Sequence, residues 1–156
     1  TLVLPPTSKT PHRSLEDIQK LKPGMNIRLC KGIYNENKNI CIKDPKMISK
    51  NYLILLKEVF KKNIYVGIAT HDIILIQNIL IMIKNLNISK DRFEFQFLYG
   101  VPVSDILLNL LKLKYKIRVY VPFGIKWYDY SIRRLSENPN ITKYIIKNLF
   151  RKNIYK

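Results

Sequence analysis

The chain has 156 residues, 47% of them hydrophobic, and a formal net charge of +17. This composition excludes a disordered protein and is sufficient for one domain with a buried core. The positive charge alone would favour a nucleic acid or an anionic membrane as partner, but the lysines are spread along the chain among Asn, Ile and Tyr, without a dense basic run.

From Asn26 onward the sequence alternates short strands with helices. Four runs rich in β-branched and aromatic residues, each bounded by Gly, Pro or Asn, are predicted as strands at 26–34, 64–71, 92–100 and 116–124. Helices are predicted at 45–62, 72–86, 104–115 and 126–138. This alternation indicates right-handed βαβ units, an α/β fold and a parallel sheet.

The predicted strands alternate apolar and polar residues. In the run 92–100, three phenylalanines alternate with Glu94 and Gln96, and the polar positions of the other strands are taken by Arg28, Arg118 and Tyr120. Apolar outer faces under helices and polar inner faces are the pattern of a βα barrel with a charged interior. Because an unpaired interior charge is costly, Glu94 is the expected counter-charge for the two arginines. Four units make only half of a barrel of about 250 residues.

The stretch YDYSIRRLSEN places Tyr130, Arg133, Arg134 and Glu137 on one face of the last predicted helix. On spacing alone this is a solvated face, with Glu137 paired to the arginines.

The few cysteines fit a reducing cytosolic setting, and no membrane span is expected. Cys30 and Cys41 are too few for a disulfide framework or a four-ligand zinc site, so no metal site is expected. The longest apolar run, 73–83, is interrupted by Gln77 and Asn78 and is shorter than a membrane span.

Five motifs occur in the order IRLCKGIY, ATHD, FEFQFLYGV, RVYVPFG and WYDYSIRRLSENPN. Together, over about residues 14–140, they resemble the second half of flavin-dependent proline dehydrogenase in its short monofunctional form. The resemblance implies a partial (βα)8 TIM-like barrel made of about the last four βα units. It also implies FAD at the carboxyl-end mouth of the strands and oxidation of L-proline to Δ1-pyrroline-5-carboxylate.

The resemblance assigns cofactor contacts to the first of these strands. Arg28 matches the arginine that hydrogen-bonds the flavin near its reactive nitrogen, and it is the expected catalytic residue because a fixed cation favours the anionic reduced ring. Cys30, Lys31 and Gly32 match the flavin-contacting stretch that follows. The family usually has a small aliphatic residue where Cys30 stands.

The second strand ends in Thr70 and His71, which match a pair that touches the FAD. The alternative for a lone histidine at a strand end is a capping or surface role. Glu94, Gln96 and Tyr99 match family positions to which we assign structural support.

Substrate contacts are implied at the end of the chain. Tyr120 and Tyr130 match tyrosines around the proline ring, and Arg133 and Arg134 match the pair that holds its carboxylate. Guanidinium forks bind carboxylates bidentately, which lysine does not reproduce. Glu137 would support these arginines.

The amino-terminal segment departs from the family. Pro5, Pro6 and Pro11 cannot donate the hydrogen bonds of a strand ladder, where the family has a fourth strand with a flavin-contacting glutamine. We expect 1–25 to be an irregular remnant of this strand and helix region, and 26–156 to be the second half of the barrel. The family's substrate-contacting lysine and strand-end aspartate belong to the other half, which is therefore an expected partner.

Electrons in this family typically pass to a membrane quinone. We expect L-proline and a quinone or other acceptor as partners and no specific nucleic acid. The expected location is the cytoplasm, with peripheral contact at the inner membrane left open. Three alternatives remain: an inactive relic of the enzyme, a basic nucleic-acid-binding module, and the related flavin barrel of methylenetetrahydrofolate reductase, which the Arg133 and Arg134 motif disfavours.

Overall fold

The computed structural model describes residues 2–4, 11–31, 42, 44–99, 104–121 and 123–125. The described strands are β1 (Leu2–Leu4), β2 (Asn26–Cys30), β3 (Tyr65–Ala69), β4 (Phe93–Leu98) and β5 (Ile117–Tyr120). The described helices are α1 (Pro11–Lys20), α2 (Pro45–Lys61), α3 (Ile73–Asn85), α4 (Ser104–Lys112) and the short 3-10 helix η1 (Lys90–Arg92). The predicted alternation of strands and helices is confirmed, while the predicted helix 126–138 lies outside the described residues.

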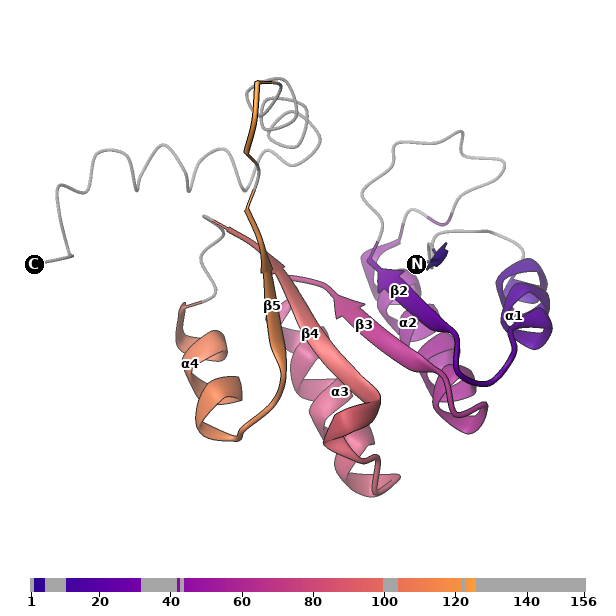
Figure 1. The fold of residues 1–156 in the computed structure, drawn as a ribbon. Coiled ribbons are helices and arrows are strands. Elements are labelled where there is room, and N and C mark those ends of the chain that lie inside the picture. The colour runs from indigo at the N-terminus through magenta and orange to yellow at the C-terminus, as the bar shows by residue number, and fades with distance from the viewer. Residues whose placement is uncertain are drawn as a thin grey trace, which may run out of the picture.

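The five strands form one parallel sheet in the order β1-β2-β3-β4-β5. Because strand-helix-strand connections are right-handed, a sheet whose strands follow chain order collects its helices on one face. Figure 1 shows α2 and α3 behind the sheet, with α1 and α4 at its two sides. We call the opposite side the open face of the sheet.

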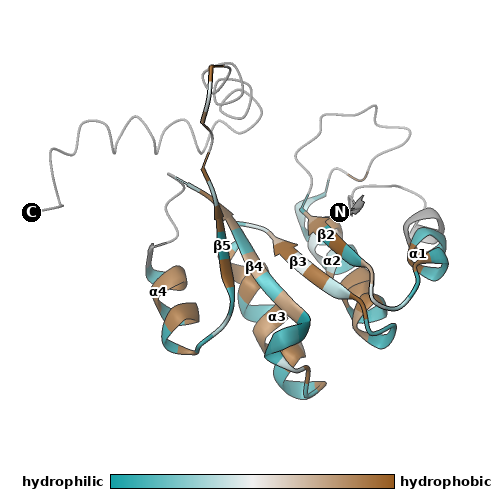
Figure 2. Ribbon diagram, in the orientation of Figure 1, coloured by the Kyte–Doolittle hydropathy of each residue, from teal (hydrophilic) through white to brown (hydrophobic). Residues whose placement is uncertain are grey.

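The hydrophobic core lies between the sheet and its helices. Phe93, Phe95 and Phe97 of β4 are almost fully buried, as the strand alternation predicts, and they pack in one cluster with apolar residues of the other strands and helices. Figure 2 shows hydrophobic stretches along the strands and on the adjoining helices. Apolar burial of this kind is the main term that holds the layers together.

Two aspartates start the helices that bring functional residues to the sheet. Asp44 accepts a hydrogen bond from the Lys46 backbone N–H at 2.9 Å, and Pro45 follows it at the first helical position of α2. Asp72 accepts from the Leu75 N–H at 3.0 Å at the start of α3. Such N-caps satisfy backbone donors that the first turn leaves unpaired.

The expectation that 1–25 is irregular is wrong for the described part of this segment. β1 pairs in parallel with β2, with Val3 opposite Arg28, and α1 begins at Pro11. A proline is favoured in the first turn of a helix, where its missing N–H would have no partner. Pro11 therefore marks a helix start rather than a damaged strand.

Candidate functional site on the open face of the sheet

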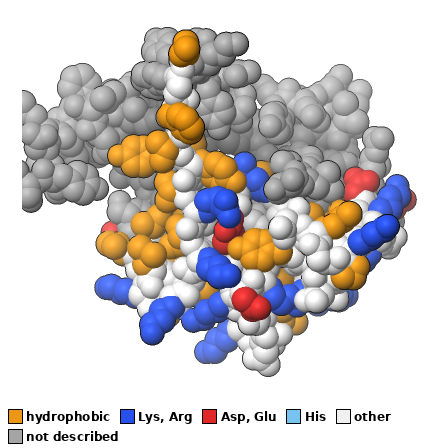
Figure 3. Space-filling view, viewed as in Figure 1, with side chains coloured by type: hydrophobic (Ala, Val, Ile, Leu, Met, Phe, Trp, Pro, Cys, Tyr) orange, Lys and Arg blue, Asp and Glu red, His pale blue; other side chains and the backbone are white. Residues whose placement is uncertain are grey.

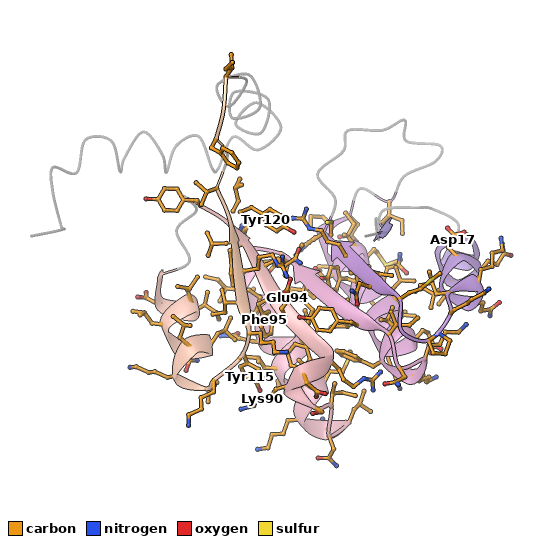
Figure 4. All side chains as sticks on the ribbon, viewed as in Figure 1. Asp17, Lys90, Glu94, Phe95, Tyr115 and Tyr120 are labelled. Atoms are coloured by element: carbon orange, nitrogen blue, oxygen red, sulfur yellow. The ribbon has the colours of Figure 1, made fainter. Side chains whose placement is uncertain are left out.

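The open face carries the polar residues of the strand alternation. Strand register places Arg28 of β2 opposite Gly67 of β3, and Gly67 opposite Glu94 of β4. Gln96 of β4 lies opposite Arg118 of β5 in the next row. Figure 3 shows an acidic group between basic groups over the middle of the sheet, and Figure 4 places Glu94 there with Tyr120 nearer the carboxyl end.

Glu94 is the centre of a hydrogen-bonded network. Its carboxylate accepts from Arg118 Nε at 2.6 Å and Nη2 at 3.1 Å, from Gln96 Nε2 at 2.7 Å and from the Tyr65 hydroxyl at 3.2 Å. Burial is the largest influence on this carboxyl and opposes ionisation, yet the bonds from Arg118 and Gln96 bring the pKa of Glu94 below its usual value. The expected pairing of Glu94 with Arg118 is thus confirmed.

Gly67 provides the space that Gln96 occupies. A Cβ atom at Gly67 would lie 2.3 Å from Nε2 of Gln96, so the carboxamide rests directly on the glycine backbone. Gln96 donates Nε2 to Glu94, and its Oε1 is buried with no hydrogen-bond partner among the described residues. A buried acceptor without a partner is unfavourable by itself.

Arg28 has a different environment from Arg118. Its guanidinium carbon lies 4.4 Å from the centre of the Tyr120 ring, and its buried Nε has no hydrogen-bond partner within the described part of the chain. The expected counter-charge Glu94 forms its ion pair with Arg118 instead. The structure therefore brings a predicted flavin contact, Arg28, against a predicted substrate contact, Tyr120.

Lys31 is held at the carboxyl end of β2 by two side chains from the helical layer. Its ammonium forms an ion pair with Asp72 and donates to the Ser49 hydroxyl at 2.9 Å. Burial is the largest single influence on the pKa of Asp72 and raises it. The hydrogen bonds from Lys31 and from the helix N–H groups act in the opposite direction and together leave the pKa of Asp72 below its usual value. The Lys31 charge is thus already compensated.

Three further predicted residues lie at the same end of the sheet. Burial raises the pKa of the Cys30 thiol, against a smaller opposite effect of the Arg28 charge, so Cys30 is a neutral thiol. The buried Thr70 hydroxyl accepts from the Asp72 N–H at 3.2 Å. His71 follows, and its Nε2 accepts from the Leu98 N–H at 2.9 Å.

Five predicted site residues lie outside the described residues: Gly32, Tyr130, Arg133, Arg134 and Glu137. Sequence reasoning missed the roles of Gly67, Asp72 and Tyr65. The sequence pattern could have indicated the role of Asp72, since an aspartate directly before an apolar helix is a typical N-cap. The indication for Gly67 was weaker: an isolated glycine inside a strand indicates that another group approaches the backbone closely.

The described residues fit a flavin in one respect that the structure itself shows. The buried Nε–H of Arg28 has no hydrogen-bond partner among the described residues, and two positions further along β2 stands the neutral thiol Cys30, whose neighbour on β3 is the small residue Ala69. A hydrogen-bond acceptor on an electron-poor ring would satisfy this donor. The described residues include no group of three or more candidate metal ligands.

Fold and site together define a parallel α/β protein with a charged, hydrogen-bonded site on the open face of its sheet. Residues 7–145 match the family model described as proline dehydrogenase. The chain is 34% identical over 140 residues to proline dehydrogenase 2 of Bacillus subtilis, covering 90% of this chain and 45% of that protein. It is 34% identical over 143 residues to a proline dehydrogenase of Deinococcus radiodurans, again covering 90% and 45%. The chain belongs to the proline dehydrogenase family.

A solved structure shares this fold. Proline utilization A from Bdellovibrio bacteriovorus, inactivated by N-propargylglycine, superposes with a TM-score of 0.73 at 24% identity, over 87% of this chain and 16% of that one. The chain spans about half the length of the curated relatives it matches, at 45% of each.

Proposed function

We propose that this chain forms the second half of the catalytic barrel of a flavin-dependent proline dehydrogenase, which oxidises L-proline to Δ1-pyrroline-5-carboxylate. The observation that carries the proposal is the contact between Arg28 and Tyr120. The family resemblance assigns one to the flavin and the other to the substrate, and they meet across two intervening strands. A cofactor and a substrate that react must likewise lie next to each other.

The barrel would be completed by the amino-terminal βα units that the curated relatives have in addition. β1 and β5 are the two edges of the described sheet. On and after β5, Val119, Val121 and Phe123 are exposed, and Phe123 is 89% accessible. Unpaired edges and exposed apolar side chains suit a partner that continues the sheet. The amino-terminal half would also supply the substrate-contacting lysine and aspartate.

FAD, when bound, would supply the hydride acceptor for the carbon next to the proline nitrogen. Arg28 would hold a fixed positive charge and an N–H donor beside the ring. Cys30, Lys31, Gly32, Thr70 and His71 would line the cofactor, and Lys31 would do so with its charge compensated by Asp72. Tyr120, Tyr130, Arg133 and Arg134 would orient the proline ring and its carboxylate.

The acceptor that takes electrons from the reduced enzyme is proposed to be a quinone. The proposed location is the cytoplasm, with the inner membrane in peripheral contact. None of the described helices is long and apolar enough to cross a membrane.

The isolated chain should hold FAD weakly, because both edges of the described sheet, β1 and β5, lack a partner strand and the other half of the proposed barrel is absent. Purification with excess FAD, followed by a visible spectrum, tests this. A stable yellow one-to-one complex that L-proline bleaches would show that the described half needs no partner.

The function itself is tested by adding the part of Bacillus subtilis proline dehydrogenase 2 that this chain does not match. We expect the two halves to bind FAD and to bleach it on addition of L-proline. The Arg28→Met variant is the control in which proline should reduce the flavin more slowly. A complex that binds FAD but is not reduced by proline would favour the inactive relic. Sequence-selective nucleic-acid binding at physiological salt would instead favour the nucleic-acid-binding module.

A further inference from the structure

The imidazole of His71 takes the place of a backbone acceptor at the end of β4. The β3 and β4 pairing ends at Ala69 opposite Gln96. Beyond this point the Leu98 N–H donates to Nε2 of His71 at 2.9 Å, a side chain that follows β3. On the other side of β4, pairing with β5 continues, since Tyr99 N–H donates to the Tyr120 carbonyl at 2.8 Å.

This contact determines which ring nitrogen carries a proton. A backbone N–H can donate only to a nitrogen with a free lone pair, so Nε2 must be unprotonated. A neutral imidazole has one N–H, which must then be on Nδ1. Protonation of Nε2 would place two N–H groups against each other and leave the Leu98 donor without its partner.

The surroundings of His71 favour the neutral ring. Arg28 lies on β2, and the Phe97 ring of β4 packs against the imidazole with centroids 6.0 Å apart. The adjacent carboxylate, Asp72, is already engaged by Lys31 and by the first turn of α3. Burial and then the Arg28 charge lower the pKa of His71, in agreement with this geometry.

We propose that His71 is held as the neutral tautomer with its proton on Nδ1 and presents this N–H to an acceptor atom of a ligand on the open face. His71 makes no other hydrogen bond to the described residues, so the Nδ1 donor is available. The ligand part rests on the proposed function, in which the acceptor is a carbonyl or hydroxyl oxygen of the flavin. His71 is then neither a cation nor a proton carrier but a donor of fixed direction.

The tautomer can be measured in the chain alone. The sequence has two histidines, so ¹⁵N NMR of the imidazole nitrogens gives two sets of signals, and His71→Gln identifies the set of His71. We expect Nε2 of His71 to appear unprotonated and Nδ1 protonated, and the ring to stay neutral as the pH falls below about 6.5, the ordinary histidine pKa. An Nε2–H tautomer, or a pKa at or above that value, would overturn the proposal.

Two substitutions separate the backbone contact from the ligand contact. His71→Gln keeps an acceptor near the Nε2 position but lacks the Nδ1 donor, whereas His71→Asn keeps a donor near Nδ1 and loses the bond to Leu98. In the free chain, hydrogen exchange at the Leu98 amide should remain slow in His71→Gln and rise about tenfold or more in His71→Asn. Equal protection in both variants would contradict the assigned contact.

The ligand contact is measured with FAD on the chain complemented by its other half. His71→Gln should bind FAD about tenfold more weakly, the loss expected for one hydrogen bond, while His12→Gln serves as the matched control. Unchanged FAD affinity in His71→Gln would overturn the donor role. If wild-type chain and its complement bind no FAD at all, the proposed function and this donor role both fail, whatever tautomer NMR finds.

Discussion

The guanidinium of Arg28 lies over the ring of Tyr120, although β3 and β4 separate their strands in the sheet. Arg28 stands in one row of the sheet with Gly67 and Glu94, and Tyr120 lies opposite Leu98 nearer the carboxyl end. A cation over an aromatic face is attracted by the ring electrons. The pair therefore links the two sides of the described sheet and defines the middle of the candidate site.

Replacing Tyr120 should show what this contact contributes. Tyr120→Phe keeps the ring face and should change the free energy of unfolding little, whereas Tyr120→Leu should lower it by about 0.5–1 kcal/mol, the usual range for a partly exposed cation-π pair. Urea unfolding of both variants measures the difference. When Arg28 is also changed to Met, Tyr120→Phe and Tyr120→Leu should have equal free energies of unfolding, because the cation is gone. An equal loss for Phe and Leu in the wild-type background would mean that the ring contact contributes nothing.

Gly67→Ala should disrupt the Gln96 position. The added methyl would lie 2.3 Å from Nε2 of Gln96, so the carboxamide must move away from Glu94. Overpacking of a buried site costs about 1–3 kcal/mol. In a Gln96→Ala background the same change should cost far less, which thermal or urea unfolding of the four proteins can determine. If the losses of unfolding free energy from Gly67→Ala and Gln96→Ala simply add in the double variant, the glycine is needed for another reason.

The Glu94 network should make stability depend on acid pH. Burial opposes ionisation, but the bonds from Arg118 and Gln96 leave the folded pKa of Glu94 below its unfolded value. Its contribution is therefore complete above about pH 4.5–5 and is lost as the pH falls through the lower, folded pKa. Glu94→Gln should lose stability at neutral pH and show a flatter decline in acid.

The matched control for this experiment is Glu58→Gln, because among the described residues the one ion pair of Glu58 is an exposed pair with Lys61. Its stability should follow the wild-type curve, since exposed pairs contribute little. Asp72, whose pKa is also lowered, retains part of the acid dependence in both variants. Urea unfolding between pH 7 and pH 3 gives the curves. Parallel curves for Glu94→Gln and wild type would contradict the prediction.

Arg133 and Arg134 are predicted from sequence to hold the substrate carboxylate. In the complemented barrel, changing either one to Met should weaken proline binding by about 2–5 kcal/mol, the usual loss when one partner of a buried charge pair is removed. FAD should remain bound. A flavin-reduction titration with L-proline and with pyrrolidine, which has no carboxylate, measures the preference. If the variants still prefer proline as strongly as wild type, YDYSIRRLSEN is a solvated salt-bridge face.

Much of the fold could be read from local patterns. The alternation of Phe93, Phe95 and Phe97 with polar residues predicted which side of β4 faces the helices. The packing of these phenylalanines in one cluster with helix residues confirms it, as in the contact of the Phe93 ring with Phe60 of α2. The helix starts at Asp44 and Asp72 also follow local rules. Pro11 was misleading because a proline cannot tell a broken strand from a helix start until the next turn is known.

The sequence by itself determined the strand and helix order, the apolar and polar sides of the strands, and the presence of acid and arginine on the polar side. Only the tertiary structure decided that Glu94 pairs with Arg118, that Arg28 contacts Tyr120, and that Gln96 rests on Gly67. The reason is register: one residue of shift between parallel strands would exchange every facing pair. Lys31 and Asp72, 41 residues apart, likewise meet only because β2 and β3 end together.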